Sequence, residues 1–104
     1  MTKKEIKRFF AGRFKTYKTQ KTTLRVQKNN LNAARSAFIV SSAVKKNAAA
    51  RNKIRRRMSE IVRTTDLSPG HDFIFSIKLE DKKPYSFKFI KEEIEKLLKL
   101  CGAL

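Results

Sequence analysis

The chain has 104 residues, and 26 Lys and Arg residues against nine Asp and Glu residues give it a formal net charge of +17. This length suits a single domain, and no apolar run approaches the roughly 20 residues that a membrane-spanning helix needs. One cysteine and one histidine exclude a structural zinc site made of Cys and His ligands.

The expected cellular setting follows from the cysteine content and from the N-terminus. The single cysteine, Cys101, excludes an intrachain disulfide, which is typical of a reducing compartment. Met1 to Glu5 lead into amphipathic sequence rather than into the apolar stretch of a signal peptide. We therefore expect a cytoplasmic protein.

The positive charge lies almost entirely in the first part of the chain. Residues 1–63 contain 19 Lys and Arg residues and only two acids, Glu5 and Glu60, whereas residues 64–104 contain seven of each kind. A cationic part joined to a neutral part indicates a dedicated surface for a polyanion. Nucleic acid is the expected partner, with an anionic membrane surface as a distant second. A role in solubility alone is less favoured, because self-repulsion on this scale is destabilising.

The first predicted element is a short helix. Thr2 and Glu5 have the spacing of a capping box, in which each side chain satisfies a free backbone N–H. The helix is expected to run to about Ala11, with Gly12 as its C-terminal stop.

Three later segments have strand patterns, whereas residues 13–20 are irregular and basic. Residues 22–28 alternate between apolar and polar side chains, and residues 72–79 alternate more cleanly. The continuous apolar run at 37–40 is typical of a strand covered on both faces. Turn and loop compositions separate these elements at 29–32, 66–70 and 80–84.

Two longer helices complete the prediction. Asn47 is the expected N-cap of a helix from Ala48 to about Thr64, and a last helix is expected from Ser86 to about Leu100 with one apolar stripe. The order helix, strands, helix, strand, helix predicts an α+β fold, an α/β sandwich in which helices pack on a sheet.

The central helix carries most of the functional information. At 100° per residue its apolar side chains form one buried stripe, which consists of Ala50, Ile54, Met58, Ile61 and Val62. Outside the stripe lie six cations and the single acid Glu60; the cations are Arg51, Lys53, Arg55, Arg56, Arg57 and Arg63. Because like charges one turn apart destabilise a helix, phosphate contact explains this surface better than solvation does. Asn52 lies among the cations and either contacts RNA or a hydrated metal ion on it, or is a plain exposed amide.

Two parts of the sequence carry specific motifs. The first is the run Ala48 to Glu60, AAARNKIRRRMSE, which follows Phe38-Ile39-Val40-Ser41 and Val44; the second is Pro69-Gly70-His71-Asp72 before an apolar strand. With these motifs the sequence resembles the bacterial ribonuclease P protein component. The resemblance covers about residues 36–100, and Lys53 stands where that family usually has Arg.

This resemblance implies a fold and a function. The fold is an α/β sandwich with a mixed sheet of about four strands, three helices and a left-handed βαβ crossover, a rare exception to the usual handedness. The function is that of the protein subunit of a ribonucleoprotein that removes the 5′ leader from precursor tRNA. In that ribonucleoprotein the RNA subunit hydrolyses the phosphodiester bond. The reaction uses Mg²⁺, which is bound mainly by the RNA subunit. The implied partners are that RNA subunit and the leader, with no membrane and no small-molecule substrate.

The resemblance also implies site residues. The RNA-binding set comprises Lys45, Lys46, Arg51, Asn52, Lys53, Arg55, Arg56 and Arg57. Phe10 is expected in a cleft for the single-stranded leader, where aromatic faces stack on unpaired bases. Phe14 and Tyr17 are candidate helpers there, although a core role suits each at least as well. No residue is assigned as a direct metal ligand, and Asn52 is the one candidate for such a contact.

The residues themselves indicate no protein-borne active site. A metal-dependent nuclease needs paired carboxylates or a poised His, but His71 lies in a turn motif where a structural role is favoured. Glu92, Glu93 and Glu95 lie among lysines on the last helix and are expected to be solvated. The alternatives to a ribonuclease P subunit are a structural RNA-binding protein, such as a ribosomal component, and a stand-alone nuclease.

Overall fold

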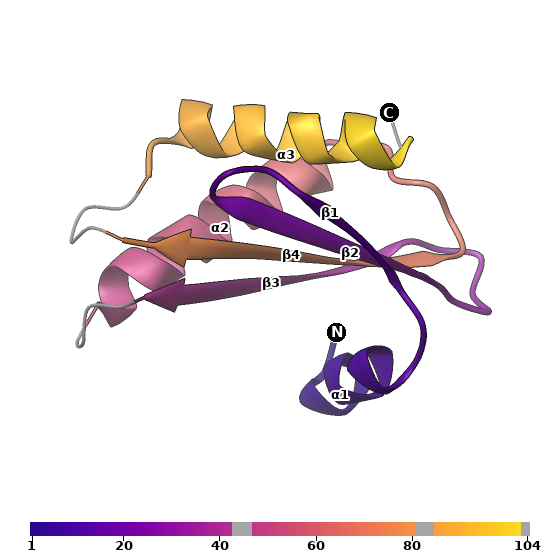
Figure 1. Cartoon of the computed structure of the whole chain (residues 1–104). Coiled ribbons are helices and arrows are strands. Elements are labelled where there is room, and N and C mark those ends of the chain that lie inside the picture. The colour runs from indigo at the N-terminus through magenta and orange to yellow at the C-terminus, as the bar shows by residue number, and fades with distance from the viewer. Residues whose placement is uncertain (43–46, 81–84, 103–104) are drawn as a thin grey trace.

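The computed structural model describes residues 1–42, 47–80 and 85–102, and its elements are shown in Figure 1. In chain order they are α1 (Lys3–Ala11), β1 (Lys15–Lys18), β2 (Thr22–Lys28), β3 (Arg35–Ser42), α2 (Ala48–Arg63), β4 (His71–Leu79) and α3 (Phe87–Cys101). None of the helices in these ranges has the length and apolar character that a membrane span requires.

The four strands form one mixed sheet with the order β1-β2-β4-β3. β1 pairs antiparallel with β2, β2 pairs antiparallel with β4, and β3 lies parallel to β4. A parallel pair needs a crossover, and here α2 connects β3 to β4 as a βαβ unit. The left hand of this crossover stays a prediction from the family resemblance.

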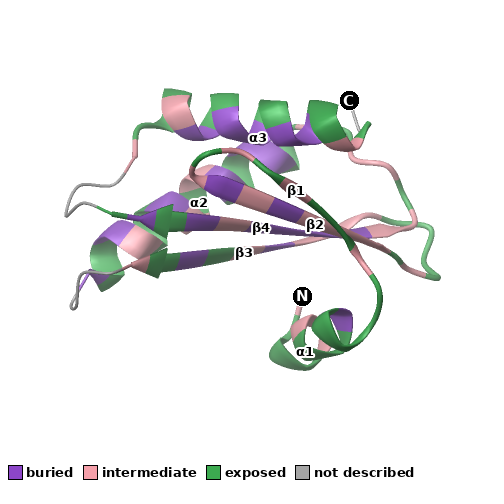
Figure 2. Ribbon diagram, in the orientation of Figure 1, coloured by how far each residue is buried: buried purple, intermediate pink, exposed green. Residues whose placement is uncertain are grey.

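Helices cover the sheet from both sides (Figure 1). α2 and α3 pack on one face, where the main core lies, and α1 lies under part of the opposite face. On β4 the main core takes alternate residues, which are Phe73, Phe75, Ile77 and Leu79. Ile74 points to the other face and packs with Phe9 of α1. β4 is therefore buried on both faces, as its colouring in Figure 2 shows.

Two sets of polar contacts attach α1 to the sheet, one from Gln27 and one between Glu5 and Arg35. The Gln27 side-chain amide on β2 donates to the backbone oxygens of Phe9 at 3.0 Å and of Arg13 at 2.9 Å. Gly12 gives this amide its room, since a Cβ at that position would lie 2.7 Å from Gln27 Nε2. The Thr2–Glu5 capping box is present, and Glu5 also pairs with Arg35 of β3.

Several predicted elements are confirmed, and four details are wrong. The three helices and the strands at 22–28 and 72–79 lie within about a residue of their predicted bounds. The irregular segment 13–20 contains β1, whose exposed lysines hide the alternation. The run at 37–40 belongs to an edge strand in which Ile39 is 36% exposed, because α1 covers only part of that face.

The other two corrections concern helix ends. Asn47 occupies the N-cap position of α2, but its side chain makes no capping hydrogen bond and its amide instead contacts Ser42 Oγ at 3.4 Å. Gly12 ends α1 in an extended conformation rather than in the left-handed one expected of such a stop. Ser86 does cap α3, with its side chain accepting from the Phe89 N–H at 3.2 Å.

Candidate nucleic-acid interface

The central helix presents its cationic side to solvent. The predicted stripe of Ala50, Ile54, Met58, Ile61 and Val62 is buried. Asn52, Lys53 and Arg56 are exposed, whereas Arg51, Arg55 and Arg57 are half-buried along the borders of the stripe. The helix therefore has the orientation that its sequence predicts. Lys45 and Lys46, the remaining predicted RNA contacts, lie outside the described residues.

The cations on α2 are almost free of acidic partners. Arg63 pairs with Glu60 at 3.2 Å, and both side chains are largely exposed. Arg57 donates to the backbone oxygen of Tyr85, just before α3. Within the described part of the chain, no carboxylate forms an ion pair with the cations from Arg51 to Arg57. This leaves a positive surface that phosphate groups can neutralise.

Asn52 organises this surface rather than standing apart as a plain amide. Its side-chain oxygen accepts a hydrogen bond from Arg55 Nη1 at 2.6 Å. This contact holds the guanidinium in place and leaves the Asn52 NH₂ group as a donor toward a ligand. The Asn52 oxygen is a poor ligand for a metal cation, because the positive charge of the neighbouring Arg55 guanidinium repels such a cation.

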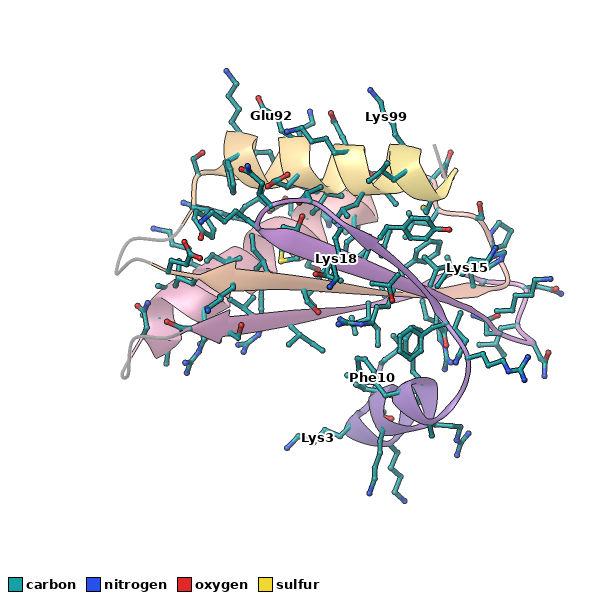
Figure 3. All side chains as sticks on the ribbon, viewed as in Figure 1. Lys3, Phe10, Lys15, Lys18, Glu92 and Lys99 are labelled. Carbon is teal, nitrogen blue, oxygen red and sulfur yellow. The ribbon has the colours of Figure 1, made fainter. Side chains whose placement is uncertain are left out.

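A second candidate surface lies between α1 and the open part of the sheet. Phe10 is 41% exposed, and its side chain lies on the sheet side of α1 in Figure 3. The guanidinium carbon of Arg25, on β2, lies 5.5 Å from the centre of the Phe10 ring, within the range of a cation–π contact. Arg25 Nη1 also reaches Ser76 Oγ at 3.3 Å. An exposed ring beside a cation suits an unpaired base and its phosphate.

The three aromatic residues predicted for the leader cleft do not share one surface. Phe14 stacks on Phe9, with ring centres 5.3 Å apart, and contacts Phe10 edge-on at 5.6 Å. Tyr17 pairs in register with Leu24 and packs against the main core on the opposite face of the sheet. The structure therefore places Phe10 and Tyr17 on opposite faces of the sheet, and Phe14 contacts the Phe10 ring.

Sequence reasoning missed a network of charges behind the second surface. Asp72 is 4% exposed and accepts from Arg35 Nε at 2.9 Å, Arg35 Nη2 at 2.7 Å and Asn29 Nδ2 at 2.7 Å. The Arg35 hydrogen bond is the main reason why the pKa of Asp72 is lowered. Glu5 also pairs with Arg35, but its pKa is lowered mainly by the Thr2 backbone N–H. No local pattern signals this network, because Arg35 and Asp72 are far apart in the sequence.

The other candidate acid and base residues either make contacts within the fold or lie on the surface, apart from Glu93. His71 Nδ1 lies 3.1 Å from the backbone oxygen of Pro69, and Glu80 pairs with Lys21. Glu92 and Glu95 are exposed as expected, but Glu93 is only 5% exposed. No group of three His, Cys, Asp or Glu residues in the described ranges lies close enough together to hold a metal ion.

A mixed four-stranded sheet packed against a helix with an exposed cationic side defines a small basic α+β domain. The family model described as Ribonuclease P matches residues 1–102, and the chain belongs to this family. Its role is therefore that of the protein subunit in a tRNA-processing ribonuclease complex. No curated protein matches the chain.

Solved structures of ribonuclease P proteins share the fold. The chain is 21% identical to the Staphylococcus aureus protein, with a TM-score of 0.78 over 99% of this chain and 94% of that one. A mutant of that protein with defective mRNA degradation activity gives 20% identity and a TM-score of 0.77, over 100% and 87%. The Thermotoga maritima protein in complex with 1-(4-fluorophenyl)-2-thiourea gives 24% and 0.71, over 91% and 92%. At these identities the likeness shows the fold alone.

Proposed function

We propose that the protein binds the catalytic RNA of ribonuclease P through the exposed side of α2 and promotes removal of the 5′ leader from precursor tRNA. The observation that carries the proposal is the set of α2 cations that have no acidic partner among the described residues. Arginine dominates this set, and a guanidinium can hold two phosphate oxygens at once. The family membership names the ribonucleoprotein in which such a surface operates.

The leader is assigned to the surface between α1 and the sheet. Phe10 offers an exposed ring for stacking on an unpaired base, and Arg25 lies beside it as a phosphate partner. The Arg35 network and Gln27 hold α1 against the sheet and so fix the position of Phe10. The protein thus contacts RNA subunit and substrate with different faces of one small domain.

The hydrolysis itself is assigned to the RNA subunit, with Mg²⁺ bound mainly by that RNA. Three of the described acids are already engaged in ion pairs, since Glu5 and Asp72 pair with Arg35 and Glu80 pairs with Lys21. The protein's own contribution is to bind and orient RNA. Asn52 acts here through its NH₂ group and through Arg55, rather than as a metal ligand.

Reconstitution tests the proposal. Wild-type protein mixed with a bacterial ribonuclease P RNA and a precursor tRNA at low millimolar Mg²⁺ is expected to accelerate leader cleavage over RNA alone. The variant K53E/R56E changes two exposed side chains of α2 and is expected to bind the RNA subunit at least about tenfold more weakly. The variant K91E/K96E on the exposed side of α3 is the matched control, with the same change in net charge.

The outcomes separate the competing functions. If wild-type protein binds the RNA without accelerating cleavage, the structural RNA-binding alternative replaces the proposal. Sustained cleavage by the protein without RNA would favour the stand-alone nuclease. Equal weakening by both double variants would show that net charge alone, rather than the α2 surface, drives binding.

A further inference from the structure

A hollow opens at the edge of the sheet beside the start of β1. The β1–β2 pairing ends at Lys15 and Val26, whereas β2 continues to pair with β4 as far as Lys28. The end of β2 therefore lacks its outer neighbour, and a hollow of about 620 Å³ lies there. This volume falls within the usual range of small-ligand sites. Lys15, labelled in Figure 3, marks the start of β1 at its rim.

The lining of the hollow is cationic and aromatic. Arg13, Lys15 and Lys28 contribute three positive charges, all of them exposed. The described lining residues include no carboxylate, and these three cations form no ion pair within the described ranges. Phe14 and Tyr17 contribute ring surfaces, and both are half-buried. The electrostatics favour an anion, and the rings favour a flat apolar group next to it.

His71 supplies a directional group on the same lining. Its Nδ1 lies 3.1 Å from the Pro69 carbonyl oxygen, which can only accept, so Nδ1 carries a proton and donates. Nε2 is then the ring nitrogen that remains for a ligand. The Tyr17 hydroxyl likewise forms no hydrogen bond with the described residues. Both groups suit the polar edge of a nucleobase.

We propose that this hollow binds one unpaired nucleotide of single-stranded RNA, with the base against Tyr17 and Phe14 and the phosphate held by Lys15 and Lys28. The site lies at the edge of the sheet, and Tyr17 and Val26 in it face away from the Phe10–Arg25 surface. It therefore adds a third contact with RNA to the two described above. The inference rests on the proposed role of the protein as an RNA-binding subunit.

His71 also makes the proposal testable, because it is the only histidine in the chain and gives a single set of imidazole NMR signals. The full chain, labelled with ¹⁵N, is titrated at constant pH with a five-adenosine oligoribonucleotide, with adenosine or with inorganic phosphate. The oligonucleotide is expected to shift the His71 signals at lower concentration than either fragment. An equal shift by inorganic phosphate alone would overturn the proposal in favour of a simple anion site. An acidic peptide that shifts the signals when the oligonucleotide does not would also overturn it.

Charge-reversal variants test whether the oligonucleotide shifts the His71 signals by binding in the hollow. K15E/K28E is expected to raise the oligonucleotide concentration for half-maximal shift about tenfold or more. K91E/K96E carries the same change in charge away from the hollow and is expected to stay within about twofold of wild type. Equal responses of the two variants would contradict the proposed site. Circular dichroism verifies that each variant is folded.

A crosslinking experiment tests the same site without mutation. A single-stranded oligoribonucleotide with 4-thiouridine is irradiated with wild-type protein, and crosslinked peptides are identified by mass spectrometry. Crosslinks to Phe14 or Tyr17 are expected, and their absence alongside crosslinks elsewhere would refute the proposal. Leader cleavage by wild-type protein with the RNA subunit is measured in parallel. If cleavage is accelerated while the hollow shows no binding, only this inference fails and the proposed function stands.

Discussion

Replacing Asp72 tests how the network behind α1 holds the fold together. Asp72→Ala removes a 4% exposed carboxylate that accepts two hydrogen bonds from Arg35 and one from Asn29. Breaking a buried ion pair costs about 3–5 kcal/mol. Here the Arg35 side chain is 33% exposed and keeps Glu5 as a partner, so we expect the free energy of unfolding to fall by about 2–3 kcal/mol.

Urea and thermal unfolding followed by circular dichroism measure this loss. For a domain of this size it corresponds to a fall in Tm of about 10–15 °C and in the urea midpoint of about 1–1.5 M. Asp66→Ala is the matched control, because Asp66 is exposed and lies outside the ion pairs described above. The reasoning would be refuted if the free energies of unfolding of Asp72→Ala and Asp66→Ala lay within about 0.5 kcal/mol of each other.

The pH dependence of the same variant has a definite sign. Because Arg35 lowers the pKa of Asp72 in the folded state, the network contributes its stability above the unfolded pKa of about 3.9. That stability is lost as the pH falls through the lower folded pKa. The difference in unfolding free energy between wild type and Asp72→Ala is therefore expected to narrow below about pH 4. A difference that widens on acidification would show that Asp72 is stabilised in its protonated form.

Three further measurements address binding and packing. If six to ten phosphates are contacted, affinity for the RNA subunit in filter binding should fall roughly 10³–10⁵-fold between about 50 and 200 mM salt; a flat response would contradict electrostatic binding. Phe10→Ala should weaken binding of a single-stranded leader about tenfold. It should change the free energy of unfolding by under about 1 kcal/mol, since Phe10 is 41% exposed. Unchanged leader affinity would show that Phe10 does not contact the leader. Ile54→Ala should lower the free energy of unfolding in urea by about 3–4 kcal/mol, because Ile54 is fully buried. Ile39→Ala should lower it by less than about 1.5 kcal/mol, because Ile39 is 36% exposed. Similar losses for the two variants would contradict the packing of the apolar stripe of α2 in the core.

The orientation of α2 was predictable from its sequence because helical periodicity is a local property. Its apolar positions recur every three to four residues, so a single face satisfies all of them. Placing that face on the core leaves Lys53 and Arg56 in solvent, and the structure confirms this arrangement. The capping box of α1 lies within a few residues of sequence and was predictable for the same reason.

The errors arose where a residue's surroundings come from distant parts of the chain. The exposed lysines of β1 conceal a strand that forms through its pairing with β2. The apolar run of β3 looks covered on both faces, yet β3 became an edge strand and left Ile39 exposed. The chain order of the strands does not determine which of them lies in the centre of the sheet.

What the sequence by itself determined is therefore the positive charge of α2 and the helix face that carries it, since both depend on neighbours within one or two turns. Only the tertiary structure decided that Phe10 and Tyr17 lie on opposite faces of the sheet, that Arg35 joins Glu5 to Asp72, and that a hollow forms beside the start of β1. Each of these features depends on strand register and on the docking of α1. Register and docking are set by contacts between residues far apart in the chain, which local periodicity does not encode.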